Sequence, residues 1–191
     1  MPKAYFSRPY QGKSSPMNYF ELFNLEVSFN IDLGKLATTY QKLQQLTHPD
    51  KFATASDRDR LLSVQKNAQV NDAYQTLKSP LSRAEYMLSL RGIDLQHEQI
   101  TLQDNAFLMQ QMEWREQLEE LDSEAEPEKK LTELDGEIKN IIQSELGALE
   151  QALVSSSEQA NQSAALVIRK LKFMYKLRQE IERKDEQLND F

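Results

Sequence analysis

Few residues in this sequence could carry out chemistry. Its 191 residues include two histidines, five glycines and no cysteine. Without cysteine the chain can form no disulfide, no thiolate metal site and no cysteine nucleophile. Neither GxGxxG nor GxxxxGK(S/T) occurs, so the sequence also lacks a glycine-rich phosphate loop. These counts disfavour most classes of enzyme, and we expect a binding or adaptor protein with no catalytic residue, metal or cofactor of its own.

The most informative polar residues form the tripeptide His48-Pro49-Asp50, which lies between two predicted helices. Its composition alone predicts a turn, because proline fixes φ and an aspartate side chain hydrogen-bonds to nearby backbone. A purely structural turn therefore remains an alternative for these residues. A general-base role for His48 is disfavoured, because no nucleophile stands near it in the sequence.

Charge is distributed unevenly along the chain. The formal net charge is −7, and 39% of the residues are hydrophobic, which is enough for a core. Residues 17–92 contain nine basic and eight acidic residues, whereas residues 93–191 contain eleven basic and twenty-two acidic ones. This shift near Gly92 predicts two units with different partners. The acidic excess argues against nucleic-acid binding, and the lack of a long apolar stretch argues against a membrane span.

The amino-terminal residues 1–16 contain three prolines and no helical pattern. We therefore expect a flexible extension or leader there and exclude it from the fold. Met17 begins the patterned part of the chain, and no signal-peptide run precedes it, which favours the cytosol.

From Met17 onward, apolar periodicity and capping residues predict an all-α protein. Asn18 is expected to cap a first helix to about Asn24, and Asp32 a second helix over 33–46. Ser56, with Asp59 three residues later, predicts a capping box for a third helix that ends near residue 78. That helix is apolar on two sides, with Leu62, Val70, Ala73 and Leu77 on one and Leu61, Val64 and Ala68 on the other. We expect it to pack against two neighbours.

The fourth helix should begin at Ser79-Pro80, with Gly92 as the residue just beyond its end. Thr101 and Asp104 predict a capping box for a fifth helix that ends near Leu121. A sixth helix should begin at Pro127, and the last should follow residues 155–157. These three helices predict a bundle with short connections. Their spacing invites comparison with tetratricopeptide repeats, but the Trp, Gly and Pro pattern of that repeat is absent. The predicted stripe of the last helix is Ala160, Ala164, Val167, Leu171, Met174 and Ile181.

The fifth helix has two different apolar faces when 100° is allowed per residue. Trp114, Leu118 and Leu121 fall within about 40° of Phe107 and form the expected core stripe. A second patch falls on the far side, and glutamates flank it. Its members are Leu108, Met109 and Met112, with Glu113, Glu116, Glu119 and Glu120 around them. An apolar patch with a polar border is a candidate binding site, although packing on another part of the chain is an equal alternative.

On the last helix, Phe173 falls opposite the core stripe, where we expect an exposed aromatic side chain. Its neighbours are basic, and the cluster from Arg169 to Arg178 contains little aromatic interleaving. We interpret this cluster as a solvated face with ion pairs and not as an RNA site.

The segments on either side of the tripeptide indicate more than a turn. Tyr19-Phe20-Glu21-Leu22-Phe23 precedes it and Asn71-Asp72-Ala73-Tyr74-Gln75-Thr76-Leu77 follows it. Residues 18–92 thus resemble a J-domain, the module by which J-proteins stimulate an Hsp-seventy-class chaperone ATPase. The resemblance implies that Asp50 meets a basic group of the chaperone and that His48 and Pro49 set the loop shape. Lys42 and Lys51 would add charge complementarity to an acidic chaperone surface.

One departure from the usual pattern lies in the second helix, which is more basic in many J-domains. Here Gln41, Gln44 and Gln45 dilute the positive charge to Lys35 and Lys42. This difference suggests a dedicated chaperone and not a general-purpose one.

From Met17 the whole chain resembles the HscB family, the J-protein co-chaperones of iron–sulfur cluster assembly. The segments that carry this resemblance are Met17-Asn18-Tyr19-Phe20, His48-Pro49-Asp50-Lys51-Phe52, Ser79-Pro80-Leu81-Ser82-Arg83-Ala84-Glu85-Tyr86, Phe107-Leu108-Met109, Arg169-Lys170-Leu171-Lys172-Phe173 and Phe191. In that family the carboxy-terminal bundle binds the scaffold protein IscU. The scaffold contacts that the resemblance implies are Leu108, Met109, Met112, Glu113, Glu116, Glu120 and Phe173. Eukaryotic relatives add a cysteine-rich metal segment, so this chain looks like the bacterial form and should bind neither zinc nor the cluster.

The expected architecture is an L-shaped all-α protein. A J-domain at 17–92 would be joined through a linker at 93–103 to a three-helix bundle at 104–191. The expected function is that of an adaptor between the scaffold and an HscA-type chaperone ATPase. Two alternatives stay open, a general-folding J-protein whose bundle binds unfolded chains and a structural helical protein with a chance His-Pro-Asp turn.

Overall fold

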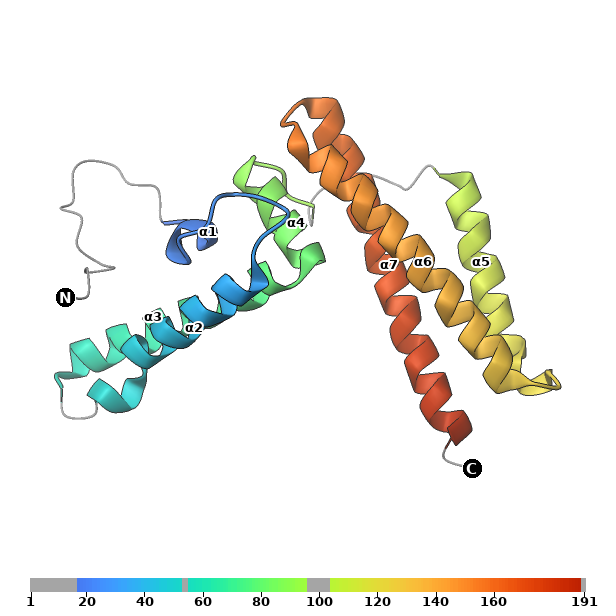
Figure 1. Cartoon of the computed structure of the whole chain (residues 1–191), viewed down its shortest axis with the longest axis horizontal. Helices are drawn as coiled ribbons and strands as arrows, with labels where there is room; N and C mark the ends of the chain where they lie inside the picture. Colours follow the sequence, from blue (N-terminus) through green and yellow to red (C-terminus); the bar gives the residue numbers. More distant parts are fainter. Residues whose placement is uncertain (1–16, 53–54, 96–103, 190–191) are drawn as a thin grey trace. The chain divides into compact units, whose positions relative to one another are not determined.

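The computed structural model describes residues 17–52, 55–95 and 104–189, and every regular element among them is a helix (Figure 1). The all-α prediction is therefore confirmed. The chain divides into two compact units, which we call unit 1 (Met1–Lys78) and unit 2 (Ser79–Phe191). Within the described ranges, no helix combines the length and the apolar character that a membrane crossing requires.

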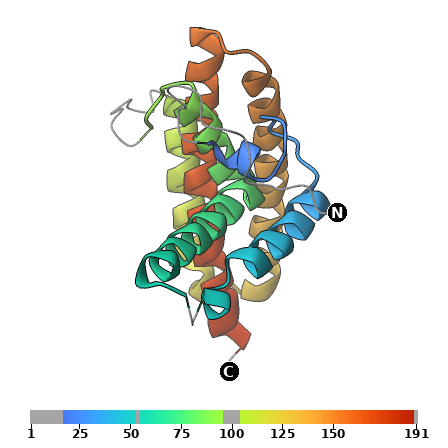
Figure 2. The same ribbon diagram turned by 90° about the vertical axis from the view of Figure 1, so that its left-hand side faces the viewer.

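Unit 1 contains one short helix and a pair of longer helices that lie side by side (Figures 1 and 2). Helix α1 (Tyr19–Leu22) contacts α3 (Asp57–Lys78), and α3 packs along α2 (Leu33–Thr47). A 3₁₀ helix, Pro49–Phe52, directly follows α2. The apolar core draws on all three α-helices, and its buried residues are Phe20, Phe23, Phe29, Leu36, Leu43, Val70, Ala73 and Leu77.

The predicted helix starts in unit 1 are confirmed by their capping hydrogen bonds. The Asn18 side chain accepts a bond from the backbone N–H of Glu21 at 2.9 Å, and the Glu21 carboxylate accepts one in return from the backbone of Asn18. The Asp32 carboxylate accepts from the backbone N–H of Lys35 at 3.0 Å. Helix α1 ends earlier than predicted, because Asn24 adopts a left-handed backbone with φ of 54°.

Helix α3 contacts two neighbours as predicted, α1 and α2, but its second apolar side is not buried. Val70, Ala73 and Leu77 are buried, whereas the side chains of Leu61 and Val64 on the opposite side are exposed. Leu62, predicted on the buried side, is exposed as well. Among the described residues, neither α1 nor α2 buries Leu61 or Val64.

Unit 2 contains a short helix and the predicted three-helix bundle. Helix α4 (Pro80–Leu90) contacts α6 (Pro127–Val154) and α7 (Glu158–Asn189), which pack along each other. Helix α5 (Asn105–Glu120) runs alongside this pair in both ribbon views (Figures 1 and 2). Helix α6 buries six apolar residues at helical spacing along one side, namely Leu131, Leu134, Ile138, Ile142, Leu149 and Leu153.

The buried face of α7 is broader than the predicted stripe. Ala164, Leu171, Met174 and Ile181 are buried as expected, whereas Ala160 and Val167 are only half-buried. The core also takes in Ala165, Ile168 and Leu177. Helix α7 packs against both α6 and α4, so its contact surface is wider than one stripe.

Two neighbouring residues, Arg91 and Gly92, fix the end of α4. Gly92 has φ of +82°, and the backbone N–H groups of Gly92 and Ile93 bond to the carbonyls of Ser89 and Leu88. This is a Schellman motif, as the predicted position of Gly92 requires. Arg91 reaches the far end of α6, where its guanidinium donates to the carbonyl of Leu153 at 2.6 Å and to that of Ser155 at 2.8 Å. It also donates to the Asn161 side chain of α7 at 2.7 Å.

The division into units places α4 with the bundle, because its contacts are with α6 and α7. The predicted J-domain of residues 17–92 thus spans unit 1 and α4, and its boundary at Gly92 stays a prediction. Most of the predicted linker 93–103 and the predicted extension 1–16 lie outside the described residues. Helix α5 begins at Asn105, and its N-cap is Asp104. The predicted capping box had Thr101 as the N-cap, so the helix starts about three residues later than predicted.

Candidate functional site

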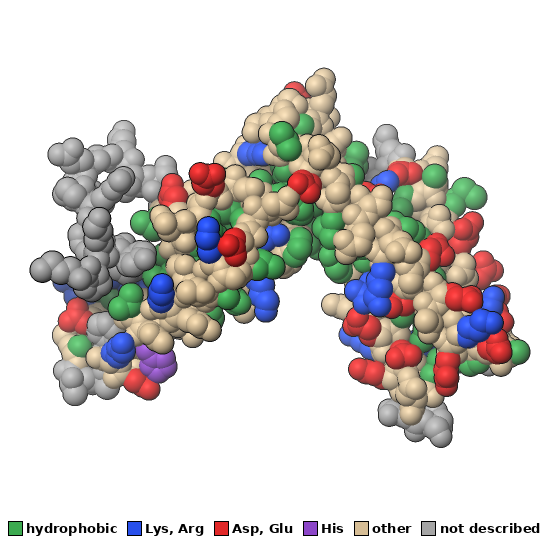
Figure 3. All heavy atoms as spheres, viewed as in Figure 1, with side chains coloured by type: hydrophobic (Ala, Val, Ile, Leu, Met, Phe, Trp, Pro, Cys, Tyr) green, Lys and Arg blue, Asp and Glu red, His purple; other side chains and the backbone are tan. Residues whose placement is uncertain are grey.

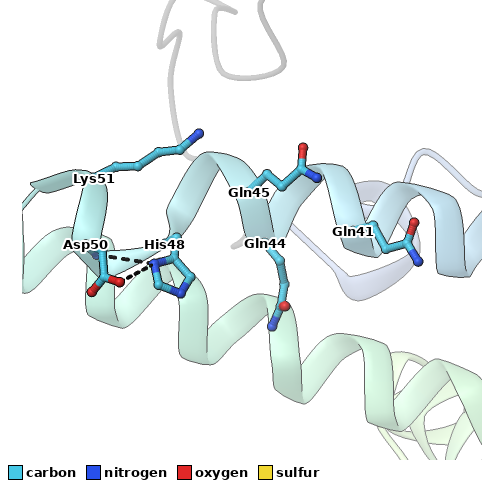
Figure 4. Close-up of a pocket in the computed structure, with 6 residues that line it drawn as sticks. All are labelled: Gln41, Gln44, Gln45, His48, Asp50 and Lys51. Carbon is cyan, nitrogen blue, oxygen red and sulfur yellow. Dashed lines mark hydrogen bonds and ion pairs between the residues drawn. The ribbon is translucent and has the colours of Figure 1, made fainter.

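The tripeptide forms a tight turn immediately after α2. His48 is the C-cap of α2, and its carbonyl accepts a hydrogen bond from the backbone N–H of Lys51 at 3.1 Å. The backbone N–H of Asp50 donates to Nδ1 of His48 at 3.3 Å (Figure 4). Nδ1 of His48 also lies 3.6 Å from the Asp50 carboxylate. The Asp50 side chain is 90% exposed, so its charge faces outward.

An open groove of about 480 Å³ borders this turn (Figure 4). His48, Asp50 and Lys51 line it together with three glutamines of α2, Gln41, Gln44 and Gln45. The predicted contact Lys42 is exposed on α2 but does not line the groove. The side chain of Pro49 lies outside the described set. In the sequence the three glutamines indicated only a loss of positive charge. In the structure they form part of the groove wall beside the turn.

The groove is better suited to binding than to bond chemistry. Its lining consists of amides, one imidazole, one carboxylate and one ammonium, and it offers no hydroxyl nucleophile. Among the described residues no group of three or more side chains is arranged to hold a metal ion. A charged, exposed carboxylate beside amide groups can form hydrogen bonds and an ion pair with a basic partner.

A second candidate surface lies on α5 of unit 2, where the side predicted to be exposed is exposed, although Leu118 of the predicted core stripe is only half-buried. Phe107 and Trp114 are buried, and the opposite side chains Leu108, Met109 and Met112 are 41%, 65% and 71% exposed. Glu113, Glu116 and Glu120 are exposed beside them. Figure 3 shows acidic and apolar side chains together on the visible face of unit 2. We call Leu108, Met109 and Met112 with these three glutamates the α5 patch.

Helix α5 is held by an aromatic cluster beneath this patch. The ring of Phe173 on α7 lies 5.8 Å from that of Phe107 and 6.4 Å from that of Trp114, measured between centroids. Trp114 also donates from Nε1 to the Glu137 carboxylate of α6 at 2.9 Å. At the start of the helix, the Lys170 ammonium of α7 lies 2.7 Å from the Asp104 carboxylate. These contacts fix which side of α5 faces away from the bundle.

Phe173 is therefore not the exposed aromatic that the helical wheel predicted. It is half-buried between two aromatic rings of α5, with the Arg115 guanidinium 5.7 Å from its ring centroid. The wheel located Phe173 correctly with respect to the α7 stripe, but it could not show that α5 packs on that side. Any contact that Phe173 makes with a partner comes from the edge of this cluster.

Three cations of the basic cluster of α7 form ion pairs, as predicted. Lys172 forms an ion pair with Glu85 of α4, and Arg178 bonds to Asp135 of α6 at 3.0 Å. Lys170 bridges Asp104 and Glu145. These cations hold the helices of unit 2 together, which supports the structural interpretation over an RNA site.

Stability of the α5 attachment should depend on acid pH through Asp104. The hydrogen bond from the Lys170 ammonium, and next that from the backbone N–H of Phe107, lowers the pKa of Asp104. A lowered folded-state pKa contributes stability that is present above the unfolded pKa of about 3.9 and is lost as pH falls through the folded pKa. Asp104→Asn keeps a capping oxygen but removes the charge. Between about pH 5 and pH 2 the urea midpoint should fall more steeply in the wild type than in this variant.

Tryptophan fluorescence can follow this unfolding, because Trp114 is the single tryptophan and lies in the aromatic cluster. Asp185→Asn, on an exposed side chain of α7, is the matched control and should keep the wild-type pH profile. Equal slopes for the wild type and Asp104→Asn would contradict the assigned role of the Lys170 pair.

Known proteins resemble this chain over nearly its whole length, and a family model matches its carboxy-terminal part. A family model described as the HSCB C-terminal oligomerisation domain matches residues 103–182. The co-chaperone protein HscB homolog of Pseudoalteromonas atlantica is 59% identical over 175 residues, which cover 92% of this chain and all of the relative. The homolog of Photobacterium profundum is 53% identical over 174 residues, covering 91% of this chain and all of that protein.

Two solved structures resemble the fold. The chaperone HscB from Vibrio cholerae matches with a TM-score of 0.81 and 48% identity, over 90% of this chain and 99% of that one. The crystal structure of the human co-chaperone protein HscB matches with a TM-score of 0.82 and 30% identity, over 96% and 92%. With this identity along nearly its whole length, the chain belongs to the HscB family of co-chaperones.

Proposed function

We propose that this co-chaperone is an adaptor with one interaction surface on each unit. The groove and turn around Asp50 would engage an HscA-type, Hsp-seventy-class chaperone and stimulate its ATPase. The α5 patch would hold the iron–sulfur scaffold protein IscU and bring it to that chaperone. The observation that carries the proposal is that units 1 and 2 each present their own exposed surface, an exposed carboxylate on a turn in one and an apolar patch with an acidic rim in the other.

The chemistry of the two surfaces supports different partners. The exposed Asp50 carboxylate requires a cationic group, and Lys51 beside it favours a partner with acidic groups close to that cation. The α5 patch requires an apolar surface, and Glu113, Glu116 and Glu120 favour basic groups around it. The ATP and the cluster ligands would belong to the partners, so this chain supplies recognition only.

Joining two weak sites in one chain raises the local concentration of one partner near the other. This predicts that both sites must lie on the same molecule. A mixture of Asp50→Ala and the double variant Leu108→Ala/Met109→Ala should fail to reproduce the scaffold-dependent increase in chaperone ATPase turnover. The mixture should match the double variant alone, because the molecule that binds the scaffold cannot stimulate the chaperone.

Wild-type protein at the same total concentration is the control for this mixture. If the mixture restores the full rate, the two sites do not need to be connected and the adaptor proposal is wrong.

A general-folding J-protein is the second candidate, and the methionines of the α5 patch favour it. Met109 and Met112 are the most exposed apolar residues of the patch, and methionine adapts to irregular surfaces. Competition separates the two functions. Denatured client chains should displace a labelled scaffold from the patch in a general-folding protein and should leave it bound in a dedicated adaptor.

A further inference from the structure

A chain of polar side chains joins α2 to α3 directly behind the turn of the tripeptide. Its first member is Thr47, the last residue of α2, which is only 4% exposed. The Thr47 hydroxyl donates to the carbonyl of Leu43 at 2.9 Å and accepts from Nδ2 of Asn67 on α3 at 3.3 Å. Asn67 in turn accepts through Oδ1 from Nδ2 of Asn71 at 3.1 Å. The residue that follows Thr47 is His48.

The other end of this chain returns to α2. Oδ1 of Asn71 accepts from the Tyr40 hydroxyl at 2.9 Å and from Nε2 of Gln44 at 2.7 Å. Gln44 also donates to the Tyr40 oxygen at 2.7 Å. The Tyr40 ring stacks on that of Tyr74 with centroids 4.0 Å apart, which restrains its hydroxyl. Figure 4 shows Gln44 turned toward α3, whereas Gln45 and Lys51 point away from it.

In this arrangement every donor of the chain faces an acceptor. Thr47 uses its single hydroxyl proton on Leu43, so it can only accept from Asn67. Asn67 must then present its oxygen to Asn71, and Asn71 must donate to it. The remaining oxygen of Asn71 faces α2, where Tyr40 and Gln44 supply the donors. Inverting one amide alone would set like groups against each other, and the three bonds between the helices hold the last turns of α2 in register with α3.

We infer that Asn67 and Asn71 are positioning residues that hold Thr47 and thereby the presentation of His48 and Asp50 to the chaperone. This inference rests on the proposed function of the turn. The described hydrogen bonds of the tripeptide join residues 48 to 51 to one another, and its Asp50 side chain is almost fully exposed. The 3₁₀ helix Pro49–Phe52 also packs against α3, and the amide chain adds a hydrogen-bonded connection from Thr47, the residue before the turn, to the same helix. A partner that binds a correctly oriented turn loses apparent affinity in proportion to the fraction of molecules that lack that orientation.

Two substitutions remove the connection without changing the volume much. Asn71→Leu deletes all three hydrogen bonds of Asn71, and Thr47→Val deletes the hydroxyl that orients the amides. The concentration for half-maximal stimulation of an HscA-type chaperone ATPase should rise about three- to tenfold in each variant. The rate at saturation should stay near wild type, because a saturating partner selects the correct orientation. Thr47→Ser keeps the hydroxyl and Gln69→Leu alters an exposed residue of α3, so both should behave as the wild type.

A spectroscopic measurement separates positioning from stability. Backbone amides of Asp50 and Lys51 in the full chain should show no millisecond exchange by NMR relaxation dispersion in the wild type and clear exchange in Asn71→Leu and Thr47→Val. If both variants keep the wild-type half-saturation and quiet amides, even with lower melting temperatures, the chain is merely structural and the inference is wrong. If Asp50→Ala still stimulates fully, the proposed function fails, whereas the relaxation data still decide whether the amide chain holds the turn.

Discussion

Asp50→Ala is expected to reduce stimulation of an HscA-type chaperone ATPase by at least about tenfold, the size of effect seen when one partner of a close charge pair is removed. The wild-type carboxylate is 90% exposed, so it is accessible to a cation of the partner. The hydrogen bond to Nδ1 of His48 comes from the backbone N–H of Asp50 and not from the Asp50 side chain, so the alanine variant should keep the turn. The measurement is steady-state ATPase turnover against co-chaperone concentration.

Two further proteins make this result specific. Asp72→Ala removes an exposed carboxylate from α3 and changes the net charge by the same amount as Asp50→Ala. This control variant should stimulate the ATPase as the wild type does. Asp50→Asn keeps the shape but not the charge, and it should be nearly as defective as the alanine variant. Scaffold binding by all three should be unchanged, because α5 lies in unit 2. Undiminished stimulation by Asp50→Ala would falsify the assignment of this turn to the chaperone.

The second large effect is expected from the α5 patch. Leu108→Ala with Met109→Ala should weaken scaffold binding about 100-fold, because each side chain contributes about 1–2 kcal/mol when it is buried against a partner. Both side chains are substantially exposed in the free protein, so truncation should change its stability little. Isothermal titration of the scaffold into the full chain gives the dissociation constants directly.

The matched control for this pair is Val154→Ala with Leu166→Ala, which trims two exposed apolar side chains of unit 2 outside the patch. It should bind with wild-type affinity. A patch variant that binds as tightly as this control would show that the scaffold docks elsewhere.

Phe173 needs a separate test, because it packs between Phe107 and Trp114. Phe173→Ala would remove part of the attachment of α5 and could reduce binding without any direct contact to the scaffold. Phe173→Leu keeps an apolar side chain in the cluster, and Trp114 fluorescence reports whether the cluster is preserved. The comparison separates a binding contribution of Phe173 from its structural one.

Local signals in the sequence predicted most of the fold. Caps and stops depend on residues within a few positions of one another, so Asn18, Asp32, Ser79 and Gly92 could be assigned without tertiary information. The exposed side of α5 followed from angles on a single helix. Resemblance to a family was required to give the tripeptide and the patch their partners, because their composition fits ordinary turns and ordinary packing equally well.

Features that depend on the register between helices were not predictable in the same way. Asn67 and Asn71 carry no local signal, since their role arises only when α2 and α3 bring Thr47 and Tyr40 opposite them. The half-burial of Phe173 likewise depends on where α5 lies, which no property of α7 determines. The exposure of Leu61 and Val64 shows the converse case, because an apolar stripe predicts a packing surface without supplying a neighbour to cover it.

The reach of Arg91 has a consequence for the order of events during synthesis. Its guanidinium bonds to groups of residues 153, 155 and 161, which leave the ribosome 62 to 70 residues later. All helices of unit 1, in contrast, are complete by Lys78. Because domains fold as units from the amino terminus during translation, unit 1 is expected to be folded before α6 and α7, the helices that α4 packs against, have been synthesised. The nascent chain would therefore carry a formed His-Pro-Asp turn, the proposed chaperone site, before the bundle of unit 2 exists.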